Sequence, residues 1–231
     1  MEGIEEQTEL QQYFGQLPGS KSEDFYDHYP IQIPVKDFPT VQSYIEYNNY
    51  KIISTAPDGI NEEILHKILD HPEEIPKFQW IYEYMRVFVI EIAQFAGELE
   101  SVCTSSTCKL MNAGNFVYQC ASHQKPQSCC AIDYISHTIE TVWQLLNNKK
   151  QFQDRRNITE QNFLALQGMA RRLYRVFSHV YFQHTDEFSA YEECTYLHLR
   201  FKTFADQYQL VTPENFIEKL NQSIQSQSKK K

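Results

Sequence analysis

Two pairs of potential metal ligands, far apart in the chain, most constrain how this sequence can fold. Cys103 and Cys108 form a C-x4-C pair, and His179 and His184 form an H-x4-H pair. Structural zinc sites of the Cys2His2 type take two thiolates and two imidazoles at tetrahedral corners, and a closely spaced pair can chelate from one short segment. If one ion binds both pairs, two segments separated by 70 residues must meet. The spacing therefore predicts a zinc site that ties the end of one helix to the end of another.

The spacing of the two histidines adds a geometric condition. On an unbroken helix, residues five positions apart point about 140° away from each other. His179 and His184 can face one ion only if the helix ends or bends between them, so we expect His179 in a last turn and His184 in the next segment. The alternative, two surface thiols and two unrelated histidines, stays open on spacing alone.

Four further cysteines are rival ligands. Cys129 and Cys130 are adjacent, which is awkward for chelating a single ion, and Cys120 and Cys194 are interpreted as small core residues. The first ten residues, MEGIEEQTEL, are acidic and lack the apolar stretch of a secretory signal. We therefore expect a cytosolic or nuclear protein whose cysteines are thiols or metal ligands rather than disulfides.

Composition excludes several classes of protein. Of the 231 residues, 42% are hydrophobic and 14% aromatic, which is enough to form a core and excludes wholesale disorder. Thirty acidic against 21 basic residues give a net charge of −9, which disfavours non-specific binding to nucleic acid or anionic membrane. No apolar run approaches the roughly 18 residues of a transmembrane helix, and the GxGxxG and GxxxxGK[ST] nucleotide-binding motifs are absent.

Apolar residues recur at steps of three and four along several segments, the pattern of helices that bury one face. The clearest run extends from Ile81 to Leu99. Other helices are predicted at 41–50, 60–69, 132–146, 163–181 (with Thr159 as N-cap) and 197–208, a polar loop at 103–114 and a strand at 115–121. The predicted organisation is an extended arm over residues 1–40, a single domain over 41–221 and a disordered polar and basic tail over 222–231.

Three arginines share one face of the helix predicted at 163–181. Arg171, Arg172 and Arg175 lie within 100° of one another on a helical projection, opposite the aliphatic residues. Clustered guanidinium groups repel one another unless an anion lies among them, and the arginine fork binds phosphate in a bidentate manner. A solvated basic face paired with local acids is the alternative, and nucleic acid is disfavoured by the net charge.

Together these motifs resemble the Mob family of kinase adaptors, and within it most closely the phocein branch. The resemblance covers residues 18–212. In chain order the matching motifs are Lys21–Tyr26 (KSEDFY), Cys103-x4-Cys108, Ala131–Tyr134 (AIDY), Ser136–Thr138 (SHT), Arg171–His179 (RRLYRVFSH), His184 and Phe201-Lys202-x-Phe204.

The resemblance implies a mainly α fold around a four-helix core, with a small β-hairpin near a structural zinc site. Cys103, Cys108, His179 and His184 match the four zinc ligands, and Arg171, Arg172 and Arg175 match a basic pocket for phosphorylated Ser/Thr peptides. The implied function is a non-catalytic adaptor that binds serine/threonine kinases and striatin-type scaffolds with their phosphatase. The implied location is the cytoplasm, extending to the periphery of Golgi and trafficking membranes.

Two enzymatic alternatives stay open at this point. A zinc-dependent hydrolase would use three protein ligands and a bound water, with Glu187 or Glu192 as general base if His184 did not ligate. The sequence contains no HExxH motif. A nucleophilic pair of Cys120 with His123 or His137 is the other alternative, although nothing in the sequence supplies an oxyanion hole.

Overall fold

The computed structural model describes residues 36, 38–54, 60 and 62–219. The chain divides between Pro39 and Thr40, and the fold described is that of the part from Thr40 onward. Almost all of the arm predicted over residues 1–40 lies outside the described residues. The tail predicted over residues 222–231 lies wholly outside them. The domain boundaries therefore stay predictions.

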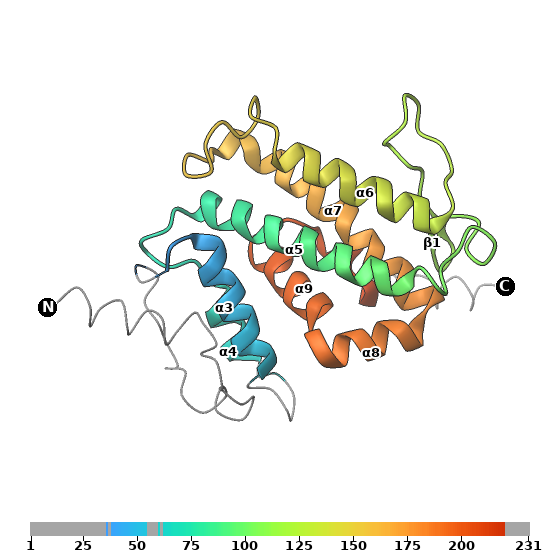
Figure 1. Ribbon diagram of the computed structural model, residues 1–231, viewed down its shortest axis with the longest axis horizontal. Coiled ribbons are helices and arrows are strands. Elements are labelled where there is room, and N and C mark those ends of the chain that lie inside the picture. Colours follow the sequence, from blue (N-terminus) through green and yellow to red (C-terminus); the bar gives the residue numbers. More distant parts are fainter. Residues whose placement is uncertain (1–35, 37, 55–59, 61, 220–231) are drawn as a thin grey trace, which may run out of the picture. The chain divides into compact units, whose positions relative to one another are not determined.

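The described part of the chain is mainly helical, with one short antiparallel hairpin (Figure 1). In chain order the elements are α3 (Val41–Ser54), α4 (Glu62–Leu69), α5 (Lys77–Leu99), β1 (Asn112–Ala113), β2 (Phe116–Val117), α6 (Ala131–Leu146), α7 (Glu160–Gln183), α8 (Thr185–Thr195), α9 (Leu197–Gln207) and a 3-10 turn at Pro213–Asn215. In the hairpin, Asn112 pairs with Val117 and Ala113 with Phe116. The mainly α fold with a small hairpin is confirmed.

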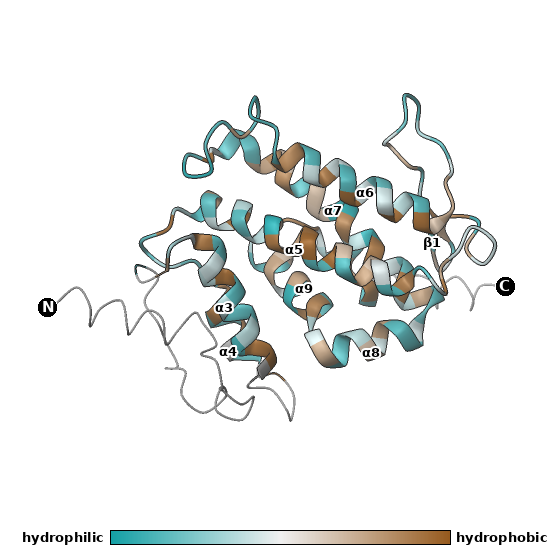
Figure 2. Ribbon diagram, in the orientation of Figure 1, coloured by the Kyte–Doolittle hydropathy of each residue, from teal (hydrophilic) through white to brown (hydrophobic). Residues whose placement is uncertain are grey.

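Helix α5 is the centre of the core. It contacts α3, α6, α7 and α9, and α7 also contacts α6 and α9. From Trp80 to Val89 the helix is buried on nearly every side, and beyond Val89 it buries a single stripe that ends at Leu99. Figure 2 shows hydrophobic segments along α5, α6, α7 and α9, while the connecting loops are mostly hydrophilic. This arrangement agrees with the four-helix core that the sequence resemblance implies.

Aromatic side chains join α5 to α9. Tyr84 stacks on Phe204 with the ring centroids 4.4 Å apart, and Phe88 meets Phe201 edge-on at 4.9 Å. Each such pair contributes about 0.5–1.5 kcal/mol beyond the burial of its surface. The indole N–H of Trp80 donates to the carbonyl of Leu69, 2.9 Å away, and so attaches the end of α4 to the same cluster.

Two elements differ from the sequence prediction. The strand predicted at 115–121 is confined to Phe116–Val117, and its partner β1 lies within the segment predicted as a polar loop at 103–114. Helix α8 was not predicted, because it buries none of its residues and therefore has no apolar stripe. Among the described residues, no helix is long and apolar enough to span a membrane.

A buried ion pair fixes α9 against α5. The guanidinium of Arg200, whose side chain is 1% exposed, donates Nη1 and Nη2 to the two carboxylate oxygens of Glu91 at 3.0 Å each. Its Nε also donates to the carbonyl of Thr195 at 3.2 Å. A fully buried cation is tolerated only when its donors are satisfied in this way.

We expect Glu91→Gln to lower the free energy of unfolding by about 3 kcal/mol, because Arg200 would remain buried without its counter-charge. Urea denaturation of both proteins at neutral pH measures the difference. The matched control is Glu98→Gln, which removes the same charge from an exposed position of the same helix. Equal stability of the two variants would show that the buried pair contributes no more than a surface carboxylate.

Candidate metal centre

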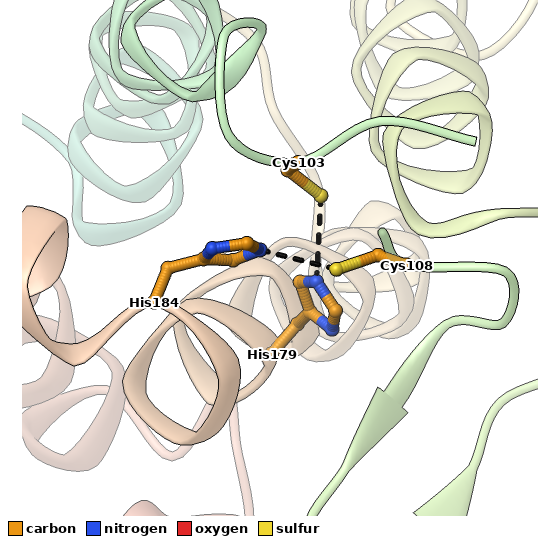
Figure 3. Close-up of side chains that lie close together, drawn as sticks. All are labelled: Cys103, Cys108, His179 and His184. Atoms are coloured by element: carbon orange, nitrogen blue, oxygen red, sulfur yellow. Dashed lines mark hydrogen bonds between the residues drawn. The ribbon is translucent and has the colours of Figure 1, made fainter. Parts of the chain in front are cut away.

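Cys103, Cys108, His179 and His184 converge at one point of the structure. Their ligand atoms all lie within 4.8 Å of one another (Figure 3). The two cysteines come from the segment that follows α5, and the two histidines come from the end of α7 and the residue after it. The structure thus brings together the two segments that the sequence prediction required to meet.

The cysteine loop is held by its own threonines. Cys103 N–H donates to the carbonyl of Leu99 at 2.7 Å, so the loop begins directly on the last turn of α5. Thr104 N–H donates to Thr107 Oγ1 at 2.8 Å, and that hydroxyl donates to the carbonyl of Val102 at 2.8 Å. Cys108 N–H donates to the carbonyl of Thr104 at 2.9 Å. These bonds fold the C-x4-C segment into a tight turn.

The histidines satisfy the geometric condition derived from their spacing. Helix α7 ends at Gln183, and His184 leaves the helical conformation with φ −140° and ψ 56°. The bend brings the two imidazole centroids to 5.5 Å. His179 therefore lies in the last turns of α7 and His184 at the junction with α8, which confirms the prediction that the helix ends between them.

The distances between the ligand atoms suit a tetrahedral ion. Cys103 Sγ lies 3.5 Å from His179 Nε2, and Cys108 Sγ lies 3.2 Å from His184 Nε2 (Figure 3). Zinc–sulfur and zinc–nitrogen bonds of about 2.3 and 2.0–2.1 Å give a sulfur-to-nitrogen edge of about 3.5 Å. His179 Nδ1 donates to the carbonyl of Asn112 in β1 at 2.8 Å, which leaves Nε2 free to ligate. The four side chains could therefore hold a metal ion.

Burial shifts the pKa values of His179, His184 and Cys103. It lowers the pKa of His179 to about 4 and also lowers that of His184, so both imidazoles are neutral at pH 7, the form that ligates metals. Burial and the neighbouring Cys108 raise the pKa of Cys103 to about 12. A bound cation must displace the proton of that thiol, so metal affinity rises with pH, about tenfold per pH unit for each proton released.

The three arginines of α7 lie on one face, as predicted, and differ in their surroundings. Arg171 is exposed, whereas Arg172 and Arg175 are half-buried. Arg175 Nη1 donates to the hydroxyl of Tyr134 at 2.8 Å, and its guanidinium lies 4.9 Å from the ring centre of Tyr118. Within the described part of the chain, none of the three arginines forms an ion pair with an acid.

Comparison with known proteins places this arrangement in a family. The profile of the Mob1/phocein family matches residues 58–219. The chain belongs to the Mob1/phocein family. The match spans both halves of the candidate metal centre and the arginine face of α7. The family that the sequence motifs resemble is thereby confirmed.

Relatives of this Mob1/phocein chain come from animals and a plant. It is 36% identical over 208 residues to MOB kinase activator-like 4 of Drosophila melanogaster, covering 88% of each chain. It is 35% identical over 215 residues to MOB-like protein phocein of Caenorhabditis elegans, covering 91% of this chain and 92% of that one. MOB kinase activator-like 2A of Arabidopsis thaliana is 30% identical over 166 residues, 68% of this chain and 76% of that one.

One of the two carboxylates considered as a hydrolytic base, Glu192, has another role in this Mob1/phocein chain. Glu192 in α8 accepts hydrogen bonds from the backbone N–H groups of His198 and Leu199, each at 2.8 Å. It therefore caps the first turn of α9, where free N–H groups and the helix dipole favour a negative charge. The sequence analysis missed this cap, because Glu192 lies within α8 and not at the N-cap position of α9, which is the left-handed residue Tyr196 (φ 51°).

Sequence analysis also missed a second group of potential ligands. Cys120, His123, Cys129 and His137 have their ligand atoms within 4.8 Å of one another. The cysteines among them were considered only as rivals for the first site, and Cys120 as a nucleophile. The signal that could have identified the group is the presence of two cysteines and two histidines in one short stretch of sequence. Cys194 is exposed and belongs to neither group.

We expect Cys103→Ser to remove one equivalent of bound divalent metal and to lower the free energy of unfolding by about 3 kcal/mol or more. The reason is that a structural ion contributes apparent binding of about 10–16 kcal/mol to the folded state. Metal analysis by mass spectrometry and urea denaturation at pH 7 measure the two effects. Cys194→Ser, at an exposed thiol, is the control and should retain both metal and stability. Full metal content in Cys103→Ser would contradict the site.

Proposed function

We propose that this chain is a non-catalytic adaptor of the Mob1/phocein family, with a structural zinc ion and a surface that binds protein kinases and phosphatase assemblies. The observation that carries the proposal is family membership over most of the chain, shared with relatives that are named kinase activators. The helical core, the Cys/His centre and the arginine face supply a physical basis for each part of that role.

The choice of zinc rests on the donor set. Two thiolates and two imidazoles at tetrahedral separations are the ligands of structural zinc sites, whereas magnesium and calcium take oxygen ligands. Cys103, Cys108, His179 and His184 would supply all four positions. Four protein ligands leave no position for a catalytic water, and Glu192 is already bonded to α9. The proposed ion therefore stabilises the fold, and nothing in the described residues supports the hydrolase alternative.

The surface proposed to bind phosphopeptides is the arginine face of α7. Arg175 is held in place by Tyr134 and Tyr118, so less side-chain freedom is lost when it binds a ligand. Arg171 and Arg172 have no acidic partner among the described residues, which leaves their guanidinium groups available to a phosphate. A phosphorylated Ser or Thr brings about −1.5 to −2 charges to such a site.

The proposed partners follow from the phocein resemblance. They are serine/threonine kinases and a striatin-type scaffold with its associated phosphatase, which the adaptor would hold together. The proposed location is the cytoplasm, extending to the periphery of Golgi and trafficking membranes. Binding to nucleic acid is not part of the proposal, because the net charge of −9 opposes it.

We expect Arg172→Ala to weaken binding of phosphothreonine peptides by about 10- to 150-fold, because a charge-assisted bond to phosphate contributes about 1.5–3 kcal/mol. Fluorescence anisotropy with a labelled degenerate phosphothreonine library, and the same library without phosphate, measures the effect at two salt concentrations. Arg156→Ala, at an exposed arginine outside α7, is the control. Equal binding of the phosphorylated and unphosphorylated libraries to the unaltered protein would exclude a phosphate pocket.

We expect affinity capture of the tagged chain from cells to recover a serine/threonine kinase together with a phosphatase scaffold. Replacing Arg171, Arg172 and Arg175 by Glu should deplete the partners held through phosphate, because the substituted carboxylates repel it. Quantitative mass spectrometry compares the two captures, with circular dichroism to show that the variant is folded. Recovery of neither class of partner with the unaltered chain would contradict the adaptor role.

A further inference from the structure

A second set of Cys and His side chains lies between β2 and α6. Cys120, His123, Cys129 and His137 come from a single stretch of 18 residues with the spacing C-x2-H-x5-C-x7-H. All four ligand atoms lie within 4.8 Å of one another, the same closeness as in the first centre. None of these residues belongs to the set Cys103, Cys108, His179 and His184.

Backbone hydrogen bonds bring the two cysteines of this set together. Cys120 and Gln127 exchange N–H to carbonyl bonds of 2.7 and 3.2 Å, which close a loop that carries His123. Met111 N–H donates to the carbonyl of Cys129 at 3.2 Å, so the end of the loop returns to the hairpin. His137 lies in the second turn of α6 and approaches the same point from the helix.

The distances within the set are those of a tetrahedral site. Cys129 Sγ lies 3.0 Å from His123 Nε2, and His137 Nδ1 lies 3.7 Å from Cys120 Sγ and 3.9 Å from Cys129 Sγ. The sulfur-to-nitrogen edge of a tetrahedral zinc site is about 3.5 Å. The two imidazole rings are 4.9 Å apart and nearly perpendicular, at 89°, so they do not stack face to face.

Ordinary thiol–imidazole hydrogen bonding does not account for the arrangement. His137 Nδ1 is nearly equidistant from two sulfurs, yet one ring nitrogen can donate or accept only one good hydrogen bond at a time. A cation bound to both thiolates and to the nitrogen satisfies all three atoms together.

Apolar packing does not account for the loop either. Apart from the half-buried His123, every side chain from Ala121 to Ser128 is exposed, and the corresponding ribbon is mostly hydrophilic in Figure 2. Ordering a segment of this kind costs about 1–2 kcal/mol per residue in backbone entropy. Its hydroxyl and amide side-chain bonds are exposed: Ser122 to Thr141 at 2.9 Å, Ser122 to the carbonyl of His137 at 3.4 Å and Gln119 to Ser128 at 3.2 Å. A metal ion is the kind of cross-link that holds such a loop without a core.

We propose that Cys120, His123, Cys129 and His137 form a second structural zinc site. Two thiolates and two imidazoles favour zinc over magnesium and calcium, which prefer oxygen ligands. Four protein ligands leave no open coordination position for catalysis. The first centre joins segments that are far apart in the chain. The second is local and fastens the loop of residues 120–130 to α6.

Metal stoichiometry tests this inference directly. The full chain, without a histidine tag, is purified under reducing conditions, washed with a weak chelator and measured by native mass spectrometry and elemental analysis. We expect two zinc ions per chain in the unaltered protein and one in Cys129→Ser. The matched control is Cys130→Ser, which changes the adjacent cysteine that belongs to neither set and should retain two.

A second measurement separates loss of the ion from loss of the fold. In Cys129→Ser, amide hydrogen exchange should become faster in residues 120–130, while α5 and α7 stay protected because the first centre is intact. Substitution with cobalt should give a tetrahedral thiolate spectrum in this variant at half the intensity of the unaltered protein.

Three results would overturn the proposal. The first is a single zinc ion in the unaltered protein that Cys129→Ser retains. The second is two zinc ions retained in Cys129→Ser, which would place the second ion elsewhere. The third is a Cys120–Cys129 disulfide, found by mass spectrometry after alkylation of the protein purified under reducing conditions.

Discussion

The meeting of the segment after α5 with the end of α7 is the contact on which the rest of the described structure depends. Both helices belong to the core, yet their far ends, at Leu99 and Gln183, are where a helical bundle is most prone to fray. The cysteine turn and the two histidines join these ends at one point. The carbonyl of Asn112 receives a hydrogen bond from His179, so the hairpin is attached to the same point.

Different interactions hold the helical core and the segment that carries the Cys/His centre. Around α5, large aromatic side chains and the Glu91–Arg200 pair fix α9. The segment between α5 and α6 is different, because its short strands and polar loops bury few large side chains. A region of that composition requires cross-links between side chains to keep one conformation.

The long helices could be predicted from the sequence because each carries apolar residues at steps of three and four, a repeat that remains visible even where α5 is buried on nearly every side. The position of the bend between His179 and His184 could also be predicted, since two ligands five positions apart cannot face one ion from an unbroken helix. Helix α8 could not be predicted in this way, because it buries no residue and its end is set by Tyr196 and Glu192. The strand predicted at 115–121 was too long and β1 was missed, because each strand has only two residues, too short for an alternating pattern.

The position of His184 has a consequence for α8. This residue ends α7, where its N–H donates to the carbonyl of Val180 at 2.8 Å, and it begins α8, where its carbonyl accepts from Phe188 N–H at 2.9 Å. The imidazole that faces Cys108 is therefore attached to the backbone at the bend itself. Helix α8 has no fully buried residue. Its direction is set by the angle at His184, by the Glu192 cap at its other end and by the packing of Tyr191 on Phe95 of α5, with the ring centroids 4.4 Å apart. One residue thus sets both the direction in which α8 leaves α7 and the position of one potential metal ligand, so a substitution that moves the backbone at this bend alters both together.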